Sequence, residues 1–167
     1  MQTRILERTT IINRPCPEVF DFFSKAENLH KITPPDLSFK IIAGDSIEMK
    51  KGTLINYHIK ISGISLEWQT LISEWNPPHS FADTQVKGPY AKWVHTHSFH
   101  EENNRTTMHD RVEYRSPGWI FEPLLEYLIV RKKLKSIFDY RQKRCEILFN
   151  HDFNSIKNHD NPLNPFR

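Results

Sequence analysis

The chain has 167 residues, 38% of them hydrophobic, and a formal net charge of +3 at pH 7. This length fits one domain with a sizeable core. The small net charge gives no electrostatic argument for nucleic-acid binding, and we expect no nucleic-acid partner. No apolar run approaches the roughly 20 residues that a membrane-spanning helix needs.

The N-terminal segment MQTRILERTT has no apolar stretch of the kind that secretory signals contain. The two cysteines, Cys16 and Cys145, are far apart in sequence and have neither the spacing of a metal site nor that of a redox motif. We therefore expect a cytoplasmic protein that needs no cofactor.

The first part of the chain predicts one strand followed by two short helices. Residues 3–13 alternate loosely and contain several Thr and Ile residues, which are typical of a strand. A helix is expected to begin near Cys16, because Pro17 suits the first turn of a helix. A second short helix is predicted over residues 26–31, and it must end before Pro34.

Six further strands are predicted before the periodicity becomes helical. They are residues 37–42, 53–61, 66–75, 80–86 and the two arms of a hairpin within 88–117. Tyr57 lies on the apolar face of its strand, and Trp68 lies on that of the next. The turn Gly88-Pro89-Tyr90 would lie at one end of the sheet.

From Trp119 to Phe149 the apolar residues recur at helical spacing and predict one amphipathic helix of about 25–30 residues. Its outer face is basic, which is typical of a solvated helix face; any contact with a membrane surface would be transient. These basic residues are Arg131, Lys132, Lys133, Lys135, Lys143 and Arg144. Residues 150–167 are polar, and we expect a loop-like tail that follows a single domain over residues 1–149.

Strands that follow one another, with the helices kept apart from them, indicate an α+β fold. A curved antiparallel sheet must cover one of its faces, and the final helix is the only predicted element long enough to do so. We therefore expect a sheet wrapped around a long C-terminal helix, with two short helices after the first strand.

The hairpin within residues 88–117 fixes which side chains share a face of the sheet. Its turn is predicted at Asn103-Asn104, because Asn tolerates a positive φ. Pairing from that turn places Trp93 opposite Tyr114, His95 opposite Val112, His97 opposite Asp110 and Phe99 opposite Met108, all on one face. The other face, which includes Arg111 and Glu113, should meet water.

The inner face of this hairpin is aromatic, but it also holds two histidines and an aspartate. A buried polar group without a partner costs roughly 1–3 kcal/mol, so we expect this face to line a partly hydrated cavity. The alternative is a His97–Asp110 pair that is satisfied within a solid core. The predicted ligand-binding residues are Tyr57, Trp68, Trp93, His95, His97, Phe99, Met108, Asp110, Val112 and Tyr114.

A paired His97 and Asp110 would orient the imidazole and favour its charged form. Such a pair in an aromatic cavity could serve as general acid and base, or could anchor a carboxylate or hydroxyl of a ligand. With His95 the pair also forms a two-His, one-carboxylate set of the kind that binds zinc or iron. Because this spacing arises by chance in a His-rich chain, we expect no metal.

The order of elements resembles the helix-grip fold of the START and Bet v 1-like superfamily, also called SRPBCC. The segment GPYAKWVHTHSFHE, followed by TTMHDRVEY, is similar to a bacterial ligand-binding branch described as polyketide cyclase/dehydrase-like. Residues 17–22, 28–34 and 140–141 also resemble that branch, and the resemblance covers about residues 3–149. It implies a deep cavity between the sheet and the final helix that binds an apolar or amphipathic small molecule.

Three functions follow as hypotheses. The first is a carrier or sensor of a small hydrophobic or amphipathic ligand. The second is an enzyme of the cyclase or dehydratase type, with His97 and Asp110 as its catalytic residues. The third is an accessory module whose long helix or tail binds another protein. The sequence makes no prediction of the oligomeric state.

Overall fold

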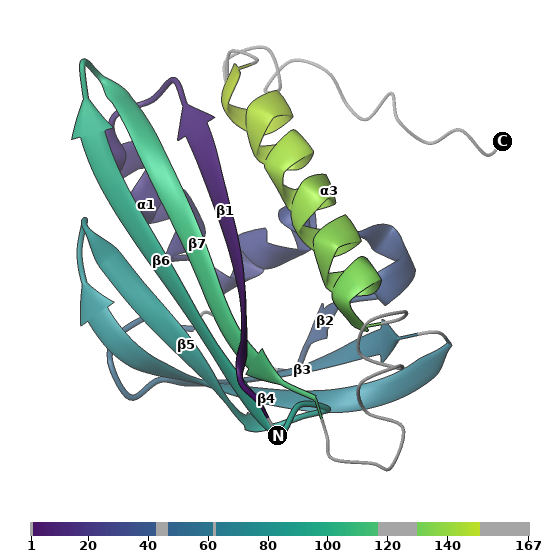
Figure 1. The fold of residues 1–167 in the computed structure, drawn as a ribbon. Coiled ribbons are helices and arrows are strands. Elements are labelled where there is room, and N and C mark those ends of the chain that lie inside the picture. The colour runs from purple at the N-terminus through teal and green to yellow at the C-terminus, as the bar shows by residue number, and fades with distance from the viewer. Residues whose placement is uncertain (1, 43–46, 62, 117–129, 151–167) are drawn as a thin grey trace, which may run out of the picture.

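The computed structural model describes residues 2–42, 47–61, 63–116 and 130–150. Its main element is a seven-stranded antiparallel sheet with the strand order β1-β7-β6-β5-β4-β3-β2. The strands are β1 (Arg4–Ile12), β2 (Lys40–Ile41), β3 (Leu54–Ile61), β4 (Ile64–Asn76), β5 (Ser80–Lys87), β6 (Lys92–Glu102) and β7 (Arg105–Arg115). Figure 1 shows β3 and β4 turned away from β6 and β7, so the sheet is strongly curved.

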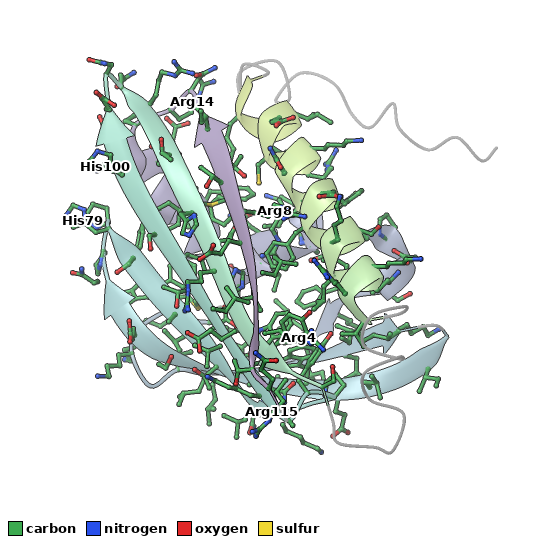
Figure 2. All side chains as sticks on the ribbon, viewed as in Figure 1. Arg4, Arg8, Arg14, His79, His100 and Arg115 are labelled. Carbon is green, nitrogen blue, oxygen red and sulfur yellow. The ribbon has the colours of Figure 1, made fainter. Side chains whose placement is uncertain are left out.

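Helices cover the concave face of this sheet. They are α1 (Cys16–Phe23), the 3-10 helices η1 (Ala26–Ile32) and η2 (Pro35–Leu37), and the long helix α3 (Arg131–Asn150). Helix α3 lies within the curve of the sheet (Figure 1). Arg8 of β1 reaches it and forms an ion pair with Asp139, with 3.1 Å between Nη2 and Oδ1 (Figure 2). The predicted α+β arrangement of a curved sheet around a C-terminal helix is confirmed.

The β6–β7 hairpin has the register that the sequence predicts. Asn103 and Asn104 form the turn with φ values of 51° and 59°, in the left-handed region that Asn tolerates. All four predicted inner pairs are present: Trp93–Tyr114, His95–Val112, His97–Asp110 and Phe99–Met108. On the outer face, Glu113 forms ion pairs with Lys92 and Arg111, as expected of a solvated surface.

Three predicted boundaries differ from the structure or fall outside it. The strand expected over residues 37–42 shrinks to Lys40–Ile41, because Pro35 begins a 3-10 turn and Ser38 takes a φ of 44°. The predicted beginning of the last helix at Trp119 lies outside the described residues. So does the tail after Asn150, and the division of the chain into a domain and a tail stays a prediction.

Two of the groups of buried side chains hold α1 and α3 against the sheet. Near the tip of the hairpin, α1 and the end of α3 pack on β6 and β7 through Val19, Phe20, Phe99, Met108, Cys145 and Phe149. Near the start of α3, Leu134 and Phe138 pack against Val112 and Tyr114. Both cysteines are free and buried, and burial raises the pKa of the Cys145 thiol to about 12. No helix in the described ranges is long and apolar enough to cross a membrane.

Candidate functional site

A cavity of about 170 Å³ lies between the concave face of the sheet, η1 and α3. Its wall is mainly apolar and includes Leu29, Ile32, Ile55, Ile59, Ile72, Phe81, Leu134, Ile137 and Phe138. An apolar protein cavity of about 150 Å³ can hold a benzene molecule. The enclosed space is therefore suited to a small organic ligand, or to one ring of a larger ligand.

An aromatic wall forms one side of the cavity. Antiparallel pairing puts Tyr57 of β3 opposite Trp68 of β4, and their rings stack with centroids 5.8 Å apart. Trp93 of β6 meets Trp68 edge-on at 5.3 Å, and Tyr90 lies 4.9 Å from Trp93. Trp68 is 6% exposed, yet its Nε1 has no hydrogen-bond partner among the described residues.

Next to the aromatic wall, where the His95 ring lies 6.4 Å from that of Trp93, the cavity wall becomes polar, and Asp110 lies behind it. This carboxylate is 2% exposed and lies between two imidazoles of the neighbouring strand. His95 Nε2 lies 3.0 Å from Asp110 Oδ1 in a hydrogen bond. His97 Nδ1 lies 2.7 Å from the same oxygen, but without the alignment of a hydrogen bond, so this second contact is chiefly electrostatic.

A second carboxylate, Asp83 of β5, faces the same two rings from the cavity side. It is opposite His95 in the β5–β6 register. Its Oδ2 lies 3.5 Å from His95 Nδ1 and 3.6 Å from His97 Nε2. Each imidazole therefore stands between two carboxylates, one on either side.

This arrangement shifts the pKa values of the two histidines in opposite directions. Burial and the neighbouring His97 lower the pKa of His95. Burial acts in the same direction on His97, but the charge of Asp110 and its contacts with both carboxylates outweigh it and raise the pKa of His97. Burial would raise the pKa of Asp110, yet the His97 charge and the His95 hydrogen bond keep that pKa below its usual range. The metal-free cluster thus favours a neutral His95 and a charged His97.

Arg141 of α3 adds a cation to the polar end of the cavity. It lines the wall, and its guanidinium lies 5.1 Å from the centre of the Phe138 ring. Arg141 Nε is buried and has no hydrogen-bond partner among the described residues. Two residues of the cavity wall, Trp68 and Arg141, thus each carry a buried N–H donor without a partner among the described residues.

The structure divides the predicted ligand-binding residues into two groups. Those that line the cavity are Tyr57, Trp68, Trp93, His95 and His97. Those that are buried but do not reach its wall are Phe99, Met108, Asp110, Val112 and Tyr114. The second group lies under α1 and α3, which pack directly on β7 and on the end of β6. Asp110 is therefore placed to support the two imidazoles rather than to touch a ligand.

The sequence did not predict two charged residues, Asp83 and Arg141, as residues of the site. Asp83 did carry a signal in the sequence, since Asp is rare in the middle of a strand and this one follows Phe81 by two residues. An aspartate on the inner face of a strand, next to His95, needs a hydrogen-bonding or charged partner. The residues that line the cavity also include Tyr90, from the predicted turn at the end of the sheet.

No family model matches the chain, and no curated protein matches its sequence. Solved structures do match its fold. The Zhui aromatase/cyclase from Streptomyces sp. R1128 matches with a TM-score of 0.64 at 14% identity, over 88% of this chain and 96% of that one. A START superfamily protein from Mycobacterium smegmatis has a TM-score of 0.64 at 14% identity, over 86% and 98% of the two chains.

A plant protein matches in the same way. The ginseng major latex-like protein 151 from Panax ginseng has a TM-score of 0.61 at 13% identity, over 88% of this chain and 97% of that one. Each match spans nearly the whole of the other chain, so the shared part is the complete fold. With its curved seven-stranded sheet around a C-terminal helix, the chain has the helix-grip fold of the START and Bet v 1-like (SRPBCC) superfamily.

Proposed function

We propose that this protein binds a small hydrophobic or amphipathic molecule in the cavity between the sheet and α3, and acts as its carrier or sensor. The observation that carries the proposal concerns Trp68: its buried ring lies at the cavity wall, and its Nε1 donor has no partner among the described residues. An unpaired buried donor costs roughly 1–3 kcal/mol, and an acceptor on a bound molecule would remove that cost.

The wall indicates the chemistry of such a ligand. Tyr57, Trp68 and Trp93 offer ring faces and edges to a planar apolar body. Arg141 and Trp68 supply donors, so the ligand should carry at least one oxygen acceptor. The fold relatives support a cavity-based role only by analogy, since one fold hosts many functions.

Native mass spectrometry of the freshly purified chain tests this proposal. We expect a species heavier than the polypeptide by the mass of one small organic molecule, which is released on denaturation and can then be identified. Purified protein that carries no such molecule, and that also fails to bind the fluorescent probe 1-anilinonaphthalene-8-sulfonate, would refute ligand binding.

Two matched tryptophan variants locate the site. Trp68→Phe keeps an aromatic ring at the cavity wall and removes the unpaired N–H. Losing one hydrogen bond of about 0.5–1.5 kcal/mol predicts roughly 2- to 12-fold weaker binding of the released molecule. Trp75→Phe is the control, because Trp75 packs against Phe20 and Phe81 and is not part of the cavity wall. Equal losses in the two variants would place the ligand elsewhere.

We propose acid–base catalysis as a second candidate function, because His97 lies at the cavity wall with Asp110 behind it. Asp110 would hold the ring, and His97 would exchange the proton with a bound substrate. A cyclase or dehydratase of this kind should convert the released molecule or a precursor with a bell-shaped pH profile. His97→Gln should then abolish turnover while binding persists; unchanged turnover would exclude this role.

A further inference from the structure

We propose that Asp83, His95 and His97 form a binding site for one divalent transition-metal ion, with Zn²⁺ as the representative ion, at the polar end of the cavity. The site is separate from the organic ligand: it requires only these three side chains, and it can be measured in protein that holds no organic molecule.

The spacing of the donor atoms supports the site. One donor atom from each of the three residues lies within 4.8 Å of the other two. Asp83 Oδ2 is 3.5 Å from His95 Nδ1 and 3.6 Å from His97 Nε2, which is long for a hydrogen bond. In a tetrahedral zinc site with bonds of about 2.0–2.1 Å, neighbouring ligand atoms are about 3.3–3.4 Å apart. The two gaps to Asp83 therefore need little adjustment to hold an ion, and the two histidine nitrogens lie within 4.8 Å of each other.

Asp110 prepares the two imidazoles for this role. It lies beside the nitrogen that points away from Asp83 on each ring, at 3.0 Å for His95 and 2.7 Å for His97. At His95 the hydrogen bond to this carboxylate holds the ring proton on the far nitrogen, and at His97 the negative charge favours a proton there, so that the near nitrogen of each ring can present its lone pair. Histidine ligands of metal sites usually have such a partner. Two lone pairs and the Asp83 carboxylate then converge, and they repel one another unless a cation lies between them.

The charges near the cluster can balance a divalent ion. Asp83 and Asp110 contribute two negative charges, and Arg141 at the cavity wall contributes one positive charge. A divalent ion would take the place of the proton on His97, with the two carboxylates as its counter-charges. Three protein ligands leave a fourth position, which would be filled by water or by an oxygen of the cavity ligand.

This ligand set differs from the one that the sequence suggested. The sequence placed Asp110 with His95 and His97, and the expectation of no metal was made for that set. In the structure Asp110 is enclosed behind the rings, with 2% of its surface exposed. Asp83 comes from a third strand and is opposite His95, on the side that faces the cavity.

Cobalt titration of the full chain tests the site. The protein is treated with EDTA, freed of the chelator and titrated with Co²⁺, whose visible absorption is much stronger in a four-coordinate site than in water. We expect a saturable visible band at one Co²⁺ per chain, and the loss of this band when one equivalent of Zn²⁺ is added. A wild-type protein that gives no such band overturns the proposal, whatever the variants do.

Matched variants assign the ion to this cluster. Asp83→Asn and His97→Gln should each weaken Zn²⁺ binding by about 100-fold or more, and Asp110→Asn by about 10- to 100-fold. Asp21→Asn and His100→Gln are the controls: Asp21 is exposed and paired with Lys25, and His100 is exposed near the end of β6, away from α3 (Figure 2). Far-ultraviolet circular dichroism confirms that each variant is folded.

The two proposals can fail independently. Metal binding that survives in folded Asp83→Asn and His97→Gln proteins, or that falls equally in the two controls, overturns the metal site and leaves the organic ligand untouched. A Co²⁺ band that is lost in both ligand variants and kept in both controls establishes the site, even in a protein that carries no organic molecule.

Discussion

Strands β6 and β7 pair residue for residue and have similar inner faces, yet only one of them reaches the cavity. Trp93, His95 and His97 of β6 line the cavity wall, whereas Met108 and Asp110 of β7 are 0% and 2% exposed and lie outside it. The difference comes from the sheet order. β7 lies between β6 and β1 under helices packed directly on it, and β6 borders β5, where the sheet turns away. The inner residues of this hairpin thus form two layers. Trp93, His95 and His97 of β6 contact the cavity, and those of β7 support them from behind.

The sharpest test of this division compares the two aspartates. Asp110→Asn should lower the free energy of unfolding by about 3–5 kcal/mol, because it removes the nearer and more deeply buried of the two carboxylates beside the histidines. Asp83→Asn should cost clearly less, since the Asp83 side chain is 19% exposed and lies farther from both rings. Urea denaturation at pH 7, followed by tryptophan fluorescence, measures both values; equal losses would remove the distinction between the layers.

Two alanine substitutions of apolar residues compare how tightly the two layers are packed. Met108→Ala should cost about 4–5 kcal/mol, near the upper end of the range for such changes, because Met108 is fully enclosed. Ile59→Ala should cost about 2–3 kcal/mol, since Ile59 borders the cavity and already lacks neighbours on that side. Thermal unfolding would rank the two variants, and the reverse order would mean that the cavity region is the better packed.

The smallest effect is expected on the outer face of the hairpin. Hydrogen bonds and ion pairs with Lys92 and Arg111 lower the pKa of Glu113 to about 2. Since this pKa is lower in the folded state, the stabilisation is fully present above the unfolded pKa and is lost as the pH falls toward 2. Glu113→Gln should cost less than about 1 kcal/mol at pH 7, because the pair is partly solvated.

The pH dependence of this variant supplies its own control. The difference in unfolding free energy between wild type and Glu113→Gln should shrink as the pH is lowered from 7 to 3, and also in high salt at pH 7. A difference that stays constant over this pH range would show that the carboxylate charge contributes nothing. It would leave the division of the inner face intact.

Local rules were sufficient to predict the β6–β7 hairpin. A turn with two Asn residues fixes the register, and strand alternation then assigns every inner side chain of both strands. Alternation puts Asp83 on the same face as Phe81, but it does not say which face that is. The β4–β5 pairing has irregularities between Gln69 and Thr70 and between Ile72 and Glu74, so the inner face of β5 cannot be counted from its neighbour.

The shape of the cavity also required tertiary information. His95 and Asp110 have the same alternation pattern and were both predicted to meet a ligand, but only His95 does line the cavity. What separates them is where α1 and α3 rest on the sheet, and periodicity within a strand contains no information about that. Ser38, an isolated residue in the left-handed region that ends η2 before β2, likewise has no turn signature such as Asn-Gly in the sequence.

Strand β1 has one partner in the sheet, β7, and Arg4 pairs with Tyr114. During synthesis β3 to β7 can join as successive neighbours while they emerge from the ribosome, because each pairs with the strand just before it. β1 is made before β3 to β7 and must instead wait for β7, with the backbone groups of its pairing edge unpaired in the meantime. Because this contact joins residues far apart in the sequence, docking of β1 is expected to be a late event in the folding of the nascent chain.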